Sequence, residues 1–222
     1  TGPNGIGMTD LGTLGGTYGS YAADINNSGQ VVGYSYITGN TANHAFITGP
    51  NGIGMTDLGT LGGIFSQAYS INDLGQVVGW SSTTDGSHNA FITGINGNDM
   101  SNVGTLGGTY SDARGINNLG QVIGSATTAN DAAQHAFLFS DGEMVDLSLL
   151  EPVVAAGWTG IRVYGINDYQ QIVGAGILNG VEQAILLSYV DSPVVLVSEP
   201  ETYTMLLVGL GLIVFMVRRR KL

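Results

Sequence analysis

The histidines stand at positions that repeat along the chain. His44 and His135 occupy one place in a recurring motif, where other copies carry Asn89 and Gln183. A metal site needs several converging ligands, and each copy supplies at most one histidine. The exchange of His for Asn and Gln therefore indicates a shared hydrogen-bonding role inside each repeat, and we predict neither a metal site nor a cofactor.

The acidic residues are numerous enough for glycosidase chemistry, which requires two carboxylates at a defined separation. Glu151 and Glu182 lie in the most divergent repeat and are the candidates for it. No Gly-x-Ser-x-Gly motif supports a triad hydrolase. The repeats stay nearly alike, whereas catalysis requires residues that one repeat alone acquires. We therefore predict no catalytic residues and a protein that is not an enzyme.

Charge is distributed unevenly along the chain. The first 197 residues hold two basic side chains, Arg114 and Arg162, against 15 acids, a net charge of −13. Such a surface repels phosphate backbones, so nucleic acid is not an expected partner. The chain has no Cys, which excludes disulfides, cysteine zinc sites and thiol nucleophiles.

Three motifs recur with a period of about 46 residues, which is typical of a repeat array. Residues 1–16 read TGPNGIGMTDLGTLGG and return unchanged at 48–63, with a diverged copy at 93–108. A second motif, Ile-Asn-x-x-Gly-Gln-Val-Val-Gly and its variants, occupies 25–33, 71–79, 116–124 and 166–174. A third contains Ala-Phe, as at Ala45 and Phe46. Because Thr1 falls inside a repeat, we expect further sequence to precede it.

The second motif predicts a hairpin, since Asn-[Asn/Asp]-x-Gly lies between two β-prone runs and its Gly can adopt the left-handed conformation. The structural turn residues are Asn26, Gly29, Asn72, Gly75, Asn117, Gly120 and Asn167. The first unit then contains strands at 21–26, 30–36, 44–48 and 55–60. Four antiparallel strands in about 45 residues is the size of a propeller blade.

We therefore predict a mainly β, propeller-like fold with four blades, and a β-solenoid as the alternative. The last unit offers three strands and no fourth. A strand at 8–13 would pair beside 182–189 and close the ring. Variable loops at 38–43, 83–88 and 127–134 recur at one place and form the expected binding face.

The combination of GTLGG, the Ile-Asn hairpin motif and His-Ala-Phe resembles the HAF repeat family of predicted extracellular proteins, over residues 1–190. The resemblance implies an exported repeat protein and brings no catalytic residues with it.

The C-terminal sequence predicts a membrane anchor. Residues 202–217 are uncharged and predict one transmembrane helix. This helix is short, because a spanning helix usually needs about 20 apolar residues. The membrane-orienting cations follow in the tail at 218–222 and should stay cytoplasmic. The domains are thus a repeat domain at 1–190, a linker with a sorting motif at 191–201, the helix and the tail. The orienting cations are Arg218, Arg219, Arg220 and Lys221.

The segment before the helix carries a recognisable motif. Val197, Ser198, Glu199 and Pro200, followed by the apolar run and the cations, resemble a PEP-CTERM sorting signal. In that family the motif is commonly Val-Pro-Glu-Pro, so Ser198 departs from it. The resemblance implies recognition by an exosortase, a membrane protease of Gram-negative bacteria that make extracellular polysaccharide.

Together these features predict an exported protein, anchored in the inner membrane before processing and then placed at the cell surface or in the biofilm matrix. Its repeat domain would be a non-enzymatic binding or structural module, with exopolysaccharide or copies of itself as partners. The alternatives are a glycan-acting enzyme on a propeller scaffold and a self-assembling fibre subunit.

Overall fold

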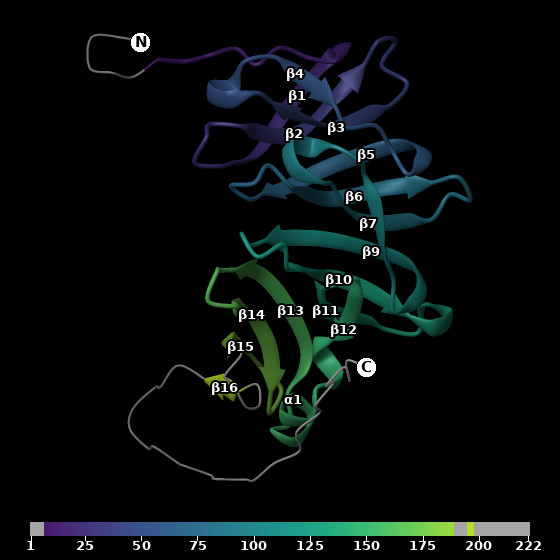
Figure 1. Ribbon diagram of the computed structural model, residues 1–222. Helices are drawn as coiled ribbons and strands as arrows, with labels where there is room; N and C mark the ends of the chain where they lie inside the picture. Colours follow the sequence, from purple (N-terminus) through teal and green to yellow (C-terminus); the bar gives the residue numbers. More distant parts are fainter. Residues whose placement is uncertain (1–6, 189–194, 198–222) are drawn as a thin grey trace, which may run out of the picture.

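A computed structural model describes residues 7–188 and 195–197. The mainly β prediction is confirmed, because these residues form four units of four antiparallel strands, which we call blades 1 to 4 (Figure 1). A single parallel bridge between His88 and Tyr110 joins blades 2 and 3 into one eight-stranded sheet. Blade 1 contains β1 (Gly15–Ile25), β2 (Val31–Ile37), β3 (Asn43–Thr48) and β4 (Met55–Asp57). Blade 2 contains β5 (Gly62–Ile71), β6 (Val77–Thr83), β7 (His88–Ile92) and β8 (Ser101–Gly104).

The other two blades repeat this order, so that each blade comes from one sequence repeat. Blade 3 contains β9 (Gly107–Ile116), β10 (Val122–Thr128), β11 (Gln134–Ser140) and β12 (Glu143–Asp146). Blade 4 contains β13 (Thr159–Ile166), β14 (Gln171–Leu178), β15 (Val181–Ser188) and β16 (Val195–Val197). The short helix α1 (Glu151–Ala155) lies in the connection between blades 3 and 4.

The hairpin between the first two strands of each blade follows from local backbone preference. Gly29 has a φ of +73°, and its N–H donates to the Asn26 carbonyl at 2.9 Å. A positive φ of this size is energetically less favourable for a residue with a side chain than for glycine. Gln170 adopts the same conformation in blade 4, with a φ of +60°. The fourth turn therefore keeps its geometry without glycine.

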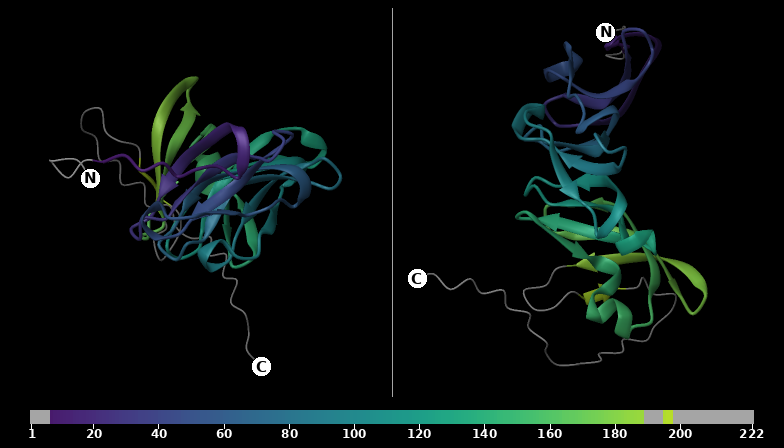
Figure 2. Two further views of the ribbon diagram at one scale, coloured as in Figure 1. Left: turned by 90° about the horizontal axis from the view of Figure 1, so that it is seen from above. Right: turned by 90° about the vertical axis from the view of Figure 1, so that its right-hand side faces the viewer.

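The blades stack face to face in one column, with blade 1 and blade 4 at opposite ends (Figures 1 and 2). Three hydrophobic clusters fill the spaces between successive blades. The cluster between blades 1 and 2 contains Val32 and Ala45 from one side and Val77 and Phe91 from the other. Burial of these faces is the main favourable contribution to the stack.

The Thr-Leu-Gly-Gly segments carry the chain from one blade to the next and help to seal the space between them. Leu58 and Leu61 pack against the cluster between blades 1 and 2. The Leu61 N–H donates to the Ser81 hydroxyl at 2.8 Å, and the Ser66 hydroxyl donates to the Gly59 carbonyl at 2.5 Å. These bonds fix the crossing chain to the next blade.

The prediction of a closed ring is wrong. Residues 8–13 form no strand, and β15 pairs with β14 and β16. In the described part of the chain no sheet joins blade 4 to blade 1. Face-to-face packing of the blades, rather than pairing of their edges, holds the column together.

The last unit also has a fourth strand, contrary to the prediction of three. β16 pairs with β15 in the register Leu186 with Val197 and Ser188 with Val195. It comes from the segment expected to be a linker, whose three apolar residues can extend along an open strand edge. Within the described residues, the parallel pairing between repeats that a solenoid requires is limited to one bridge, between His88 and Tyr110.

Candidate asparagine groove

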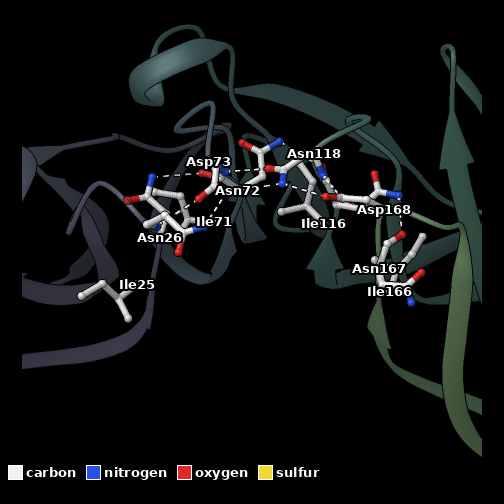
Figure 3. Close-up of a pocket in the computed structure, with 12 residues that line it drawn as sticks. Ile25, Asn26, Ile71, Asn72, Asp73, Ile116, Asn118, Ile166, Asn167 and Asp168 are labelled. Atoms are coloured by element: carbon white, nitrogen blue, oxygen red, sulfur yellow. Dashed lines mark hydrogen bonds between the residues drawn. The ribbon is translucent and has the colours of Figure 1, made fainter.

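The hairpin turns of all four blades converge on one shallow hollow of about 280 Å³ (Figure 3). We call it the asparagine groove. Each blade contributes three consecutive residues from the end of its first strand and the turn that follows. The groove is lined by Ile25, Asn26, Asn27, Ile71, Asn72, Asp73, Ile116, Asn117, Asn118, Ile166, Asn167 and Asp168.

An inner row of amides links each blade to the next. The Asn26 amide Nδ2 donates to the Asn72 carbonyl, Asn72 donates to Asn117, and Asn117 donates to Asn167, each at 3.0 Å. The same Asn26 side chain accepts from the N–H groups of Ser28 and Gln30. One residue type therefore both shapes its own turn and bonds to the neighbouring blade.

An outer row alternates between amide and carboxylate along the groove, in the order Asn27, Asp73, Asn118 and Asp168. Asn27 donates to the Asp73 carboxylate from its backbone N–H at 3.0 Å and from its amide at 2.7 Å. The Asp73 N–H donates to Asn118 Oδ1 at 2.8 Å. Asn118 then donates to the Asp168 carboxylate at 2.8 and 2.9 Å.

The electrostatics of the groove favour binding over proton transfer. Hydrogen bonds from the Asn27 backbone and side chain lower the pKa of Asp73 below its usual value, so this carboxylate stays ionised and is a poor general acid. The lining residues include no His, Glu, Lys or Arg. Amides and ionised carboxylates at regular spacing can instead exchange hydrogen bonds with a polar ligand.

The recurring histidine position has the predicted hydrogen-bonding role. His44 Nδ1 lies 2.8 Å from Asp57 Oδ2, and His135 Nδ1 lies 2.7 Å from Asp146 Oδ2. Asn89 makes the corresponding bond, from its amide to Asn102 Oδ1 at 3.2 Å. In blades 1 to 3 this contact ties the third strand to the fourth. No three His, Cys, Asp or Glu side chains converge within the described residues.

A second cluster, between blades 2 and 3, was not predicted from the sequence. The His88 ring lies between Trp80 and Tyr110, with centroid distances of 3.8 and 4.5 Å and nearly parallel planes. Arg114 lies 4.9 Å from the centre of the Tyr69 ring. We call these five residues the aromatic cluster. The repeat carries Tyr34 and Ser125 at the place of Trp80, and this departure was the signal available in the sequence.

Burial perturbs the ionisable groups of the aromatic cluster. It lowers the pKa of His88, and together with the Asp112 carboxylate it raises the pKa of Tyr110 to about 12. Asp112 is buried, accepts from the Ser125 hydroxyl at 2.6 Å and forms an ion pair with Arg114. Trp80 and Tyr110 cover the two faces of the His88 ring. Because Trp80 and His88 belong to blade 2 and Tyr110 belongs to blade 3, the cluster joins the two blades.

The variable loops predicted as a binding face lie at the opposite end of the first two strands from the groove, since Gly15 pairs with Ile37 there. Their polar side chains bond mainly to their own blades. Asn40 accepts from the Thr17 N–H at 2.8 Å, and Asp131 accepts from the Thr109 N–H at 2.8 Å. These loops therefore brace the start of the first strand in blades 1 and 3.

The two carboxylates weighed for hydrolysis have separate surroundings. Glu182 forms an ion pair with Arg162, with 2.6 Å between Oε1 and Nη2. Glu151 is exposed at the start of α1. No contact in the described residues joins these two side chains.

The mainly β fold is similar to that of two solved structures of TolB. TolB from Acinetobacter baumannii has a TM-score of 0.54 and 10% identity, over 81% of this chain and 43% of that one. Putative TolB from Agrobacterium tumefaciens has a TM-score of 0.54 and 10% identity, over 78% and 62%. The chain thus spans less than two thirds of either protein, and the likeness concerns the fold alone.

A weaker match, with a TM-score of 0.38 and 5% identity over 82% of this chain and 71% of the other, is the β-propeller domain of the Trilobed protease from Pyrococcus furiosus. No curated protein matches the sequence.

The model of the PEP-CTERM protein-sorting motif matches residues 196–221. The predicted sorting signal is thereby confirmed, and it implies export and a membrane-anchored C-terminal signal. Ser198, Glu199, Pro200, the predicted helix at 202–217 and the basic tail lie outside the described residues, whereas the backbone of Val197 belongs to β16. Within the described residues, no helix is long and apolar enough to span a membrane.

Proposed function

We propose that this chain is an exported protein that an exosortase-type membrane protease processes and delivers to the cell surface or extracellular matrix of a Gram-negative bacterium. The sorting-motif match at 196–221 carries this proposal. The apolar run would hold the chain in the inner membrane, with Arg218, Arg219, Arg220 and Lys221 on the cytoplasmic side. The likeness of the repeats to HAF repeats agrees with an extracellular destination.

The position of β16 adds a physical detail to this proposal. The sorting motif begins at Val197, whose backbone pairs with Leu186 at the edge of blade 4. Ser198 therefore follows the folded domain directly. Processing beside this residue would leave all four blades complete, because β16 lies on the N-terminal side of the cut.

The test is the intact mass and membrane fractionation of the chain in a polysaccharide-producing host, with and without its exosortase. We expect the segment after about Ser198 to be lost only when the enzyme is present. Pro200→Ala should block the loss, whereas Thr84→Ala, in an exposed loop, should not change it. An uncut, membrane-bound chain in both hosts would refute the proposal.

We propose further that the repeat domain is a non-enzymatic module that binds a neutral extracellular polysaccharide along the asparagine groove. Sugar hydroxyls both donate and accept hydrogen bonds, and the outer row of the groove offers amides and carboxylates in alternation. The net charge of −13 over the first 197 residues repels acidic polymers and favours a neutral one.

Binding can be measured by affinity electrophoresis in gels that contain the neutral polysaccharide of the host. Asp73→Ala removes a carboxylate from the middle of the groove, and we expect about tenfold weaker binding, equivalent to roughly 1.4 kcal/mol. Asp85→Ala is the matched control, because this aspartate is also exposed but bonds only within its own loop. Equal retardation of the two variants would contradict binding at the groove.

For the enzyme alternative, the part of the chain that the structure describes offers no comparable arrangement around Glu151 and Glu182. Replacement of both Glu151 and Glu182 by Gln should leave any glycan turnover by the preparation unchanged. Loss of turnover in that variant would instead favour a hydrolase.

A further inference from the structure

A second hollow, of about 230 Å³, lies between blades 1 and 2, at the end of the strands opposite the asparagine groove. We call it the histidine pocket. Blade 1 contributes the ends of β2 and β3 and the loop between them, and blade 2 contributes the start of β5. The pocket is lined by Ile37, Thr41, Ala42, His44, Thr60, Gly63 and Ile64.

Contacts behind His44 fix its ring and the position of its proton. The Gly59 N–H donates to Asp57 Oδ1 at 2.7 Å, and His44 Nδ1 lies 2.8 Å from Asp57 Oδ2. Because an ionised carboxylate only accepts hydrogen bonds, the neutral imidazole carries its proton on Nδ1. Its Nε2 is then an acceptor, and it accepts from no protein group within the described residues. His44 therefore offers one acceptor to a ligand in the pocket.

Thr41 is the second polar side chain that a ligand can reach. The Thr60 hydroxyl is already paired, because it donates to the Gly63 carbonyl at 2.8 Å and accepts from the Gly62 N–H at 3.2 Å. Thr41 is exposed, and its hydroxyl makes no hydrogen bond in the part of the chain that the structure describes. A threonine hydroxyl can donate as well as accept. The histidine pocket thus provides one acceptor and one donor.

The rest of the pocket wall is apolar, and it consists of Ile37, Ala42 and Ile64. Ile64 is 60% exposed, so this wall remains open to a ligand. Between blades 2 and 3 the corresponding places all carry polar residues, which are Thr83, Ser87 and Thr109. The repeat itself therefore does not require an apolar wall, and this wall distinguishes the histidine pocket from the next interface.

We infer that the histidine pocket binds the acetamido group of an N-acetylated amino sugar. In this complex the acetamido N–H donates to His44 Nε2, and the acetamido carbonyl accepts from the Thr41 hydroxyl. The acetamido methyl group packs against the apolar wall, where its burial is favourable. Acetylation leaves the sugar uncharged, which suits a chain with a net charge of −13 over its first 197 residues. This site is separate from the asparagine groove, and the inference does not rest on binding there.

The test uses the full-length protein in mild detergent and two disaccharides of the same linkage, N,N′-diacetylchitobiose and cellobiose. Only the first of them carries acetamido groups. Saturation-transfer NMR identifies the sugar protons that contact the protein, and a titration gives the affinity. We expect the acetamido methyl protons to receive the strongest saturation. The affinity for diacetylchitobiose should depend on His44, whereas any affinity for cellobiose should not.

His44→Asn is the decisive variant, because blade 2 naturally carries Asn89 at this place and the fold accommodates it. The new amide can still donate to Asp57, but the acceptor Nε2 is lost. We expect about tenfold weaker binding of diacetylchitobiose. His135→Asn is the matched control, since it makes the same exchange in blade 3, away from the pocket, and it should leave this affinity unchanged.

Ile64→Thr tests the apolar wall separately from the histidine. It introduces the residue that blade 3 carries as Thr109, at an exposed position of β5. We expect about fourfold weaker binding of diacetylchitobiose, as for the loss of roughly one buried methylene group.

Equal affinity of the unchanged protein and the His44→Asn variant would overturn the inference, as would equal losses for His44→Asn and His135→Asn. N-acetyl-lysine amide presents the same acetamido group without a sugar. If it bound as tightly as diacetylchitobiose, the assignment to a sugar would be wrong. These outcomes are separable from those of the proposed function, because binding at the groove is measured with Asp73→Ala in polysaccharide gels and processing is measured by intact mass.

Discussion

Asn72 provides the sharpest test of the physical account of the stack. Its buried side chain donates to Gln76 Oε1 at 2.8 Å and to the Asn117 carbonyl at 3.0 Å. It also accepts from the N–H groups of Leu74 and Gln76 at 3.1 and 3.0 Å. Asn72→Ala removes all four bonds. At a net value of about 1 kcal/mol for each bond, with some relaxation, we expect a loss of about 3 kcal/mol in the free energy of unfolding.

Asn167→Ala is the matched control for this prediction. Asn167 makes the same bonds within its turn, to Tyr169 and Gln171, but it is exposed and makes none to another blade in the described residues. Because water can replace exposed bonds, we expect a loss of about 1 kcal/mol. Urea unfolding in detergent micelles, followed by the fluorescence of Trp80 and Trp158, measures both values. A loss below about 0.5 kcal/mol for Asn72→Ala, or equal losses for the two variants, would refute the reasoning.

Three further predictions concern a glycine, a histidine and the sorting motif. Gly79→Ala should destabilise the chain by about 1–3 kcal/mol in the same urea assay, because the added Cβ would lie 2.0 Å from the Gln67 carbonyl oxygen; unchanged stability would contradict this packing. The lowered pKa of His88 favours its neutral form in the folded state, so stability should fall as pH drops from about 6.5 through that lowered pKa. His88→Phe should remove this part of the pH dependence, and an identical pH profile would show that His88 does not cause it. Ser198→Pro restores the common motif and should raise the processed fraction seen by intact mass, whereas a lower fraction would argue against recognition through this motif.

The sequence was sufficient for features that depend on neighbouring residues. The Asn-x-x-Gly turn follows from local backbone preferences, and Gly29 adopts the positive φ that such a turn requires. The exchange of His44 with Asn89 predicted a hydrogen bond inside each blade, since both residues can make the same contact. The sorting signal was recognisable because it is a contiguous motif.

The sequence alone did not decide how the blades are arranged. The amide rows of the groove depend on the position of one turn relative to the next, 45 to 50 residues away, which is set by packing between blades. The aromatic cluster likewise joins residues of β5, β6, β7 and β9, whose meeting no local pattern encodes.

The ring closure and the missing fourth strand were wrong for a related reason. Both predictions assumed that pairing of free strand edges determines the arrangement of the blades. Burial of the apolar blade faces determines it instead, because these faces stack the blades into one column. The edge of β15 is instead covered by β16, from beside the sorting motif. The sequence by itself thus determined the repeat, its turns and the sorting signal, because these are local. Only the tertiary structure decided the stack, the groove and the aromatic cluster, because these depend on side chains that meet across blades.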